Sequence, residues 1–135
     1  VRAIDADPLG TIGAHTVNHF ASSALPPAEA LTEMVASASR LADETGSRPQ
    51  FFAYPYGDKT SCGRRDFELA RQAGFTAAVT TVKGVVTEAD RCALFGLPRV
   101  SLNGDYQRLD YVDTLLSGVP FAARNLALRL AGRRG

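Results

Sequence analysis

The sequence lacks tryptophan, has only two cysteines and carries almost no net charge. Its 15 basic residues are balanced by 14 acidic residues, a net charge of +1, so no strong field would recruit nucleic acid or an anionic membrane. No apolar run approaches the roughly 20 residues that span a bilayer, and the N-terminus does not resemble a signal peptide. Cys62 and Cys92 form no CxxC pattern and are expected to be free thiols, which leaves the compartment open.

What the sequence does contain is typical of one globular domain. Its 135 residues are enough for a hydrophobic core, with 45% hydrophobic and 21% charged residues. No internal repeat or linker divides the chain. We therefore expect residues 1–135 to belong to a single domain.

Periodicity and turn residues predict alternating helices and strands. Residues 28–45 show the i, i+3, i+4, i+7 apolar spacing of an amphipathic helix ended by Gly46, and residues 64–73 form a helix ended by Gly74. The predicted strands are residues 9–14, 51–54, 75–81 and 97–102. The other predicted segments are a helix tail at 1–8, a turn at 103–105, helices over 109–130 broken at 118–120, and a frayed basic tail at 129–135.

This alternation predicts an α/β fold with a parallel sheet and covering helices. In such sheets ligands bind at the carboxyl ends of the strands. The segments expected at this rim are His15 and His19, the turn at 54–58, Thr80 and Thr81, and the turn at 102–105.

The only two histidines of the chain lie four positions apart, at His15 and His19. If residues 15–19 form one helical turn, the two side chains share a face and can converge on one metal ion. Thr16 is placed to accept a hydrogen bond from an amide two or three residues on. Two histidines do not complete a metal site, however, and this spacing also occurs by chance.

Two motifs resemble those of one family. Residues 13–19 (GAHTVNH) resemble the His-Ser/Thr-x-x-His motif of polysaccharide deacetylases, the NodB-homology (carbohydrate esterase family 4-like) family. Residues 52–57 (FAYPYG) are similar to its second signature. Residues 74–81 and 97–100 resemble its later strands, so the resemblance extends from about residue 11 to about residue 102.

The resemblance implies a distorted (β/α) barrel, here a partial barrel, and a metal-dependent hydrolase. Its substrates would be acetamido sugars of the chitin-oligosaccharide, peptidoglycan or poly-N-acetylglucosamine class. In this family a divalent ion, usually zinc, binds both histidines and an aspartate and activates a water that attacks the acetamide. A carboxylate takes the proton of that water, and a histidine protonates the leaving amine.

Carried over to this sequence, the resemblance assigns His15 and His19 as metal ligands and the Tyr56 N–H as the oxyanion donor. The residues that it places against the substrate are Tyr54, Pro55, Tyr56, Gly57 and Arg99. Packing at the edge of the core is an equal alternative for Tyr54, a weaker one for Tyr56, and a structural salt bridge is the alternative for Arg99. We expect Asp58 to be a solvated turn residue.

The sequence also departs from the family pattern. The Thr-Phe-Asp-Asp strand end that supplies the base and the third ligand does not appear, and Asp5 and Asp7 lie in a helix-terminal segment instead. Ala53 stands where many members have arginine, and a third histidine, the usual general acid, is absent. Because barrels of this type take about 250 residues, we expect the chain to be the C-terminal portion of such a domain.

Three hypotheses follow. The first is that the chain carries part of the site of an N-deacetylase. The second is a catalytically impaired carbohydrate-binding or scaffold remnant of the same fold, favoured by the missing histidine. The third is an unrelated α/β domain in which His15 and His19 are structural.

Overall fold

The computed structural model describes residues 1–104 and 106–132. Its helices are α1 (Arg2–Asp5), α2 (Pro27–Thr45), α3 (Arg64–Gln72), α4 (Leu109–Leu116) and α5 (Val119–Gly132), with short 3-10 helices η1 (Ser22–Ala24) and η2 (Glu88–Cys92). Its strands are β1 (Phe51–Ala53), β2 (Ala77–Lys83) and β3 (Leu97–Arg99).

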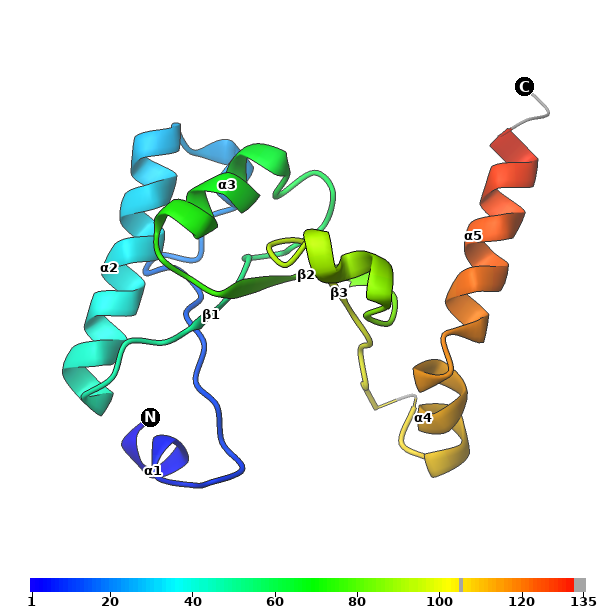
Figure 1. The fold of residues 1–135 in the computed structure, drawn as a ribbon, viewed down its shortest axis with the longest axis horizontal. Coiled ribbons are helices and arrows are strands. Elements are labelled where there is room, and N and C mark those ends of the chain that lie inside the picture. The colour runs from blue at the N-terminus through cyan, green and yellow to red at the C-terminus, as the bar shows by residue number, and fades with distance from the viewer. Residues whose placement is uncertain (105, 133–135) are drawn as a thin grey trace.

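The three strands form one parallel sheet in the order β1-β2-β3, as the alternation predicted. Phe52 pairs with Ala78 in the register of β1 and β2, and both side chains are buried. Helices α2 and α3 lie against this side of the sheet (Figure 1). The neighbouring side chains Phe51 and Val79 point to the other face, which is more exposed, so only one face of the sheet carries the core.

Helix α2 has the predicted bounds within one residue. Pro27 occupies the first turn, where its missing N–H costs no hydrogen bond. Met34 and Ala38 from the apolar stripe are fully buried. Gly46 ends the helix in the left-handed conformation, with φ of 81°, and its N–H donates to the Ala42 carbonyl.

The strand predicted over residues 9–14 does not form. Leu9 is 96% exposed, and its N–H donates to the Asp7 carboxylate in a turn. Only Ala14 pairs with the sheet, through Ala14 N–H to Phe51 carbonyl and Ala53 N–H to Ala14 carbonyl, at 2.8 and 2.9 Å. Within the described residues no strand pairs with the other side of this segment, so little holds it in an extended ladder. Asp5 and Asp7 occupy the helix end and turn, as expected.

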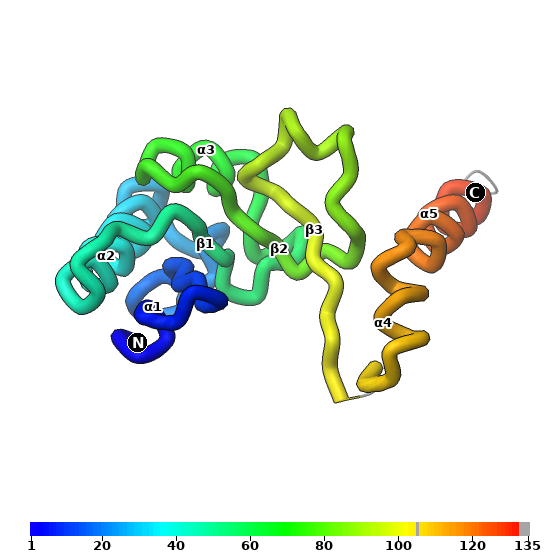
Figure 2. Tube along the Cα trace, turned by 60° about the horizontal axis from the view of Figure 1, so that its bottom comes forward, coloured from blue at the N-terminus to red at the C-terminus, as the bar shows by residue number. Residues whose placement is uncertain are grey.

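The C-terminal helices α4 and α5 lie apart from α2 and α3, beyond the β3 edge of the sheet (Figures 1 and 2). The predicted break is present, with Gly118 at φ of 76° between the two helices. The predicted fraying from residue 129 is wrong up to Gly132, where α5 ends, and residues 133–135 lie outside the described residues. Gly104 lies in the predicted turn, whereas Asp105 is also outside the described residues.

None of the described helices is long and apolar enough to cross a membrane. Both cysteines are free thiols, Cys62 buried and Cys92 exposed. Burial, together with nearby Asp66 and Asp58, raises the pKa of the Cys62 thiol to about 11, so this thiol stays protonated at neutral pH.

Candidate functional site

The two histidines lie on a bend of unusual backbone conformation. Thr16 and His19 both have positive φ, 61° and 58°, so the helical turn considered for residues 15–19 does not form. The bend nevertheless brings the imidazole rings of His15 and His19 together edge to face, with centroids 4.8 Å apart. The Thr16 hydroxyl accepts a hydrogen bond from the His19 N–H at 3.1 Å, the role expected for it.

His15 is oriented by the end of strand β1. Its Nδ1 lies 2.7 Å from the Ala53 carbonyl oxygen. A carbonyl can only accept, so Nδ1 is the donor, and in the neutral ring with this tautomer the lone pair is on Nε2. Metal-bound histidines in proteins are commonly held in this way, with the second ring nitrogen donating to a backbone carbonyl. His15 is therefore prepared to act as a ligand through Nε2.

Glu33, on helix α2, accepts hydrogen bonds from the bend at residues 15–19. The sequence alone did not predict a role for this residue. One carboxylate oxygen accepts the N–H groups of Val17 and Asn18, at 3.0 and 2.8 Å, and the other accepts the Asn18 side-chain amide at 2.6 Å. Partial burial pushes the pKa of Glu33 upward, but the hydrogen bonds from Asn18 and Val17 together outweigh it, and the pKa lies below its ordinary value. No sequence pattern marks Glu33, because its partners lie fifteen and sixteen residues earlier.

The second site segment is the turn after β1. Tyr56 and Gly57 both have positive φ, 61° and 65°. Thr81 from β2 holds this turn, because its hydroxyl donates to the Tyr56 carbonyl at 2.6 Å and its N–H donates to the Gly57 carbonyl at 2.8 Å. Within the described residues the Tyr56 N–H has no acceptor. It remains free to donate to a bound ligand.

These segments line one cavity of about 310 Å³, a size at the lower end of small-molecule sites. Its walls are formed by His15, His19, Ala53, Tyr54, Tyr56, Val79, Thr80, Thr81 and Arg99. The Tyr56 ring, 60% exposed, packs edge to face on His19 with centroids 5.1 Å apart. The strand ends therefore do meet at one rim, as predicted, although the segment at 102–105 does not contribute its described residues to this cavity.

Some of the residues that the family resemblance assigns to the substrate are buried. Tyr54 is 2% exposed, and its hydroxyl donates to the Phe95 carbonyl at 2.9 Å, so its side chain belongs to the core. Pro55 and Gly57 are also buried. The cause is strand alternation, which turns Phe52 and Tyr54 toward the helices. Burial of these three residues does not favour contact with the substrate, so their assignment stays a prediction, whereas Tyr56 and Arg99 are exposed and line the cavity.

The Tyr54 hydroxyl can be tested separately from the site. Burial raises the pKa of this phenol, with Cys62 and Asp66 adding to the effect, so it stays protonated as a donor. Tyr54→Phe is expected to lower the free energy of unfolding by about 1 kcal/mol, because the Phe95 carbonyl loses its partner. Urea denaturation measures this, with Tyr56→Phe as the exposed control, expected within about 0.5 kcal/mol of the parent. Equal losses in the two variants would contradict the core assignment.

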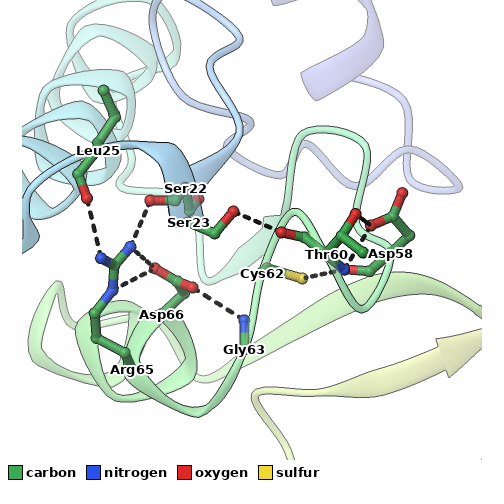
Figure 3. Close-up of polar contacts among 9 residues, drawn as sticks. All are labelled: Ser22, Ser23, Leu25, Asp58, Thr60, Cys62, Gly63, Arg65 and Asp66. Carbon is green, nitrogen blue, oxygen red and sulfur yellow. Dashed lines mark hydrogen bonds and ion pairs between the residues drawn. The ribbon is translucent and has the colours of Figure 1, made fainter.

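The loops that follow the two site segments are tied to each other (Figure 3). The Ser23 hydroxyl donates to the Thr60 carbonyl at 2.7 Å. Arg65 donates to the carbonyls of Ser22 and Leu25 and pairs with the buried Asp66, whose carboxylate also accepts the Gly63 N–H. Helix α3 thus fastens the chain after His19 to the chain after the Tyr56 turn.

Asp58 begins the second of these loops, outside the cavity lining. Its carboxylate accepts the Thr60 hydroxyl and the N–H groups of Thr60 and Ser61, which lowers its pKa. It is a turn residue, as expected. Arg99 makes no ion pair within the described residues, so the structural salt bridge that was its alternative is not observed there.

Comparison with known proteins identifies the family. The polysaccharide deacetylase family model matches residues 1–78, more than half of the chain. The chain belongs to the polysaccharide deacetylase family. No curated protein sequence matches it.

Three solved structures have a similar fold. The Streptococcus pyogenes deacetylase PplD, in complex with acetate, is 26% identical over 70% of this chain and 39% of its own, with a TM-score of 0.62. IcaB from Ammonifex degensii is 22% identical over 79% of this chain and 46% of its own, with a TM-score of 0.60. A de-N-acetylase from Aggregatibacter actinomycetemcomitans is 15% identical, covers 67% of this chain and 32% of its own, and has a TM-score of 0.51. The last two similarities show the fold alone, and the chain spans less than half the length of each of the three proteins.

The two histidines fit part of the metal site that the resemblance to polysaccharide deacetylases implies. The lone pair at His15 Nε2 and the adjacent imidazole of His19 are suitable ligands for zinc and similar ions. Within residues 1–104 and 106–132, no group of three or more histidine, cysteine, aspartate or glutamate side chains could hold an ion. The Asp58 carboxylate accepts hydrogen bonds within its own turn. Asp5 and Asp7 lie in a helix end and a turn and are not part of the cavity lining.

Proposed function

We propose that the protein carrying this chain is a metal-dependent N-deacetylase of a poly- or oligosaccharide, and that residues 1–135 are part of its NodB-homology domain. Family membership supports the reaction class. The observation that carries the proposal is that His15, His19 and Tyr56 line one cavity, with the two imidazole rings in contact and with no acceptor for the Tyr56 N–H among the described residues. The substrate class proposed is an N-acetylated sugar polymer such as chitin oligosaccharide, peptidoglycan or poly-N-acetylglucosamine.

His15 and His19 would hold a divalent cation, for which zinc is the proposal. When bound, such an ion polarises a carbonyl and lowers the pKa of water toward about 7. The Ala53 carbonyl keeps the proton of His15 on Nδ1, so that Nε2 remains available as the ligand atom.

The second part of the mechanism is stabilisation of charge on the acetamide oxygen. The Tyr56 N–H would donate to this oxygen as negative charge develops on it, and a preorganised donor of this kind is worth roughly 3–4 kcal/mol. Thr81 fixes both carbonyls of the turn, so the N–H is held in place before the substrate arrives. The exposed Tyr56 ring and the Arg99 guanidinium would contact the sugar.

Chelation tests the proposal directly. The full-length protein is incubated with an N-acetylglucosamine oligomer, and released amine is measured before chelation, after it, and after zinc is restored. We expect release to fall to the uncatalysed level on chelation and to return with zinc, because both histidines are ligands in the proposed site. Amine release that persists in protein shown to be free of metal would contradict the metal-dependent reaction.

A second candidate is a carbohydrate-binding remnant of the same fold without catalysis. The observation that favours it is that residues 1–135 contain two histidines, both assigned as ligands, which leaves none within this stretch for the general acid. This candidate predicts binding of the oligomer without release of amine. Isothermal titration beside the amine assay separates the two, since catalytic release eliminates the second candidate.

A further inference from the structure

We propose that Glu33 is a positioning residue that holds the bend at residues 15–19 in the conformation required for metal binding. The inference rests on the proposed function, since it concerns the same two histidines. Glu33 lies on α2, and within the described residues its hydrogen bonds go to Val17 and Asn18 and not to either imidazole. Its action is through Val17 and Asn18, the two residues between Thr16 and His19.

The bend needs an external partner because of its backbone. Left-handed conformations are strained for residues other than glycine, and this bend contains two, Thr16 and His19. Successive backbone N–H groups in such bends form concavities that bind anions. Here the anion is supplied internally, since one oxygen of Glu33 accepts the N–H groups of Val17 and Asn18 at 3.0 and 2.8 Å.

The second oxygen of Glu33 adds a third hydrogen bond to the charged carboxylate. It accepts the Asn18 side-chain amide at 2.6 Å, so all three donors address the same group. A glutamine at position 33 could keep these contacts only as neutral hydrogen bonds, with its oxygen on the two backbone N–H groups and the Asn18 amide turned so that its oxygen accepts from the glutamine N–H₂ group. Charge-assisted hydrogen bonds are about twice as strong as neutral ones.

Glu33 is held in place because helix α2, which carries it, is anchored in the core. Met34, next to Glu33, and Ala30, one turn earlier, are 0% and 1% exposed in the core. His15 is held separately by the Ala53 carbonyl of β1. The two ligands are therefore fixed from two different elements, His15 from the sheet and the segment leading to His19 from α2.

The test compares Glu33→Gln with Glu29→Gln in the full-length protein. Glu29 is exposed on the same helix one turn earlier, and it makes no hydrogen bond within the described residues. Amide hydrogen exchange in metal-free protein reports the bend itself. We expect exchange at Val17 and Asn18 to accelerate at least tenfold in Glu33→Gln and to stay unchanged in Glu29→Gln, with β2 amides equally protected in all forms.

Cobalt provides the second readout. For the parent, we expect binding of Co²⁺ with a visible absorption spectrum that reports ligand geometry. Loss of an outer-shell partner typically weakens metal affinity about 10- to 100-fold, so Glu33→Gln is expected to bind Co²⁺ that much more weakly and to show an altered spectrum at saturation. A purely structural role would lower stability without changing the spectrum of the saturated site.

Asn18→Ala tests the same contact without altering the helix. It removes the side-chain hydrogen bond to Glu33 and is expected to produce a smaller change in the same direction. The inference is overturned if Val17 and Asn18 exchange at parental rates in Glu33→Gln, or if Glu29→Gln reproduces the effect. Failure of the parent to bind Co²⁺ would contradict the proposed metal site, whereas the exchange measurement would still decide the role of Glu33 in the bend.

Discussion

Replacing His15 with asparagine is expected to abolish metal binding and deacetylation while leaving the fold intact. The asparagine side-chain amide occupies nearly the same place as Nδ1 and can still donate to the Ala53 carbonyl, 2.7 Å from Nδ1 in the structure. What it removes is Nε2, the proposed ligand atom. The loss should exceed about 100-fold in kcat/KM, because outer-shell partners alone are worth up to about that factor.

Three measurements check this expectation together: amine release from an N-acetylglucosamine oligomer, zinc content of the purified full-length protein, and thermal unfolding. The free energy of unfolding without metal should change by no more than about 1 kcal/mol, since the hydrogen bond is retained. His19→Ala is expected to give the same losses of zinc and activity. Retention of stoichiometric zinc in both variants would show that the histidines are not the ligands and would favour an unrelated, structural role.

Gly57→Ala is expected to cause the largest loss of stability of the substitutions considered. Gly57 has φ of 65°, and a Cβ at this position would lie 2.8 Å from the Thr81 nitrogen and 3.1 Å from the Tyr54 carbonyl oxygen. Both neighbours are backbone atoms of the sheet and its turn, so they cannot rotate away as a side-chain end can. The cost combines left-handed strain of about 1 kcal/mol with disruption of the Thr81 N–H to Gly57 carbonyl bond, and should reach about 2–3 kcal/mol.

A matched control is available at Gly74, which has φ of 86° and no atom within 4 Å of its Cβ position. Gly74→Ala carries the backbone strain without the collision, so the expected loss is about 1 kcal/mol. Urea denaturation of both variants isolates the contribution of the collision. Activity of folded Gly57→Ala should also fall, because the turn that holds the Tyr56 N–H is displaced. Equal losses at the two glycines would mean that the turn accommodates the added methyl group.

Much of the fold could be predicted from local patterns. The amphipathic spacing over residues 28–45 and the glycines at positions 46 and 74 predicted α2 and α3 closely, since one buried helix face and a left-handed end residue leave local marks. The parallel order followed from strands alternating with helices. The two motifs, each at the end of a strand or extended segment, were enough to predict the family that the comparisons confirm.

The details of the site depended on contacts between distant segments. Residues 9–14 resemble a strand locally, but a strand forms only where neighbours complete its hydrogen bonds, and Ala14 alone has such a neighbour. Tyr54 was predicted at the substrate because the motif places it there, whereas the one-residue alternation of β1 and a hydrogen bond to Phe95, forty-one positions away, place its side chain in the core.

The histidine pair shows most clearly which features follow from the local sequence and which depend on contacts between distant segments. Their spacing and the motif around them marked His15 and His19 as partners without any structure. Their actual arrangement is a left-handed bend rather than a helical turn, hydrogen-bonded to the Ala53 carbonyl from β1 and the Glu33 carboxylate from α2. No sequence window contains these contacts, because the energy that stabilises the bend comes from groups that only folding brings beside it.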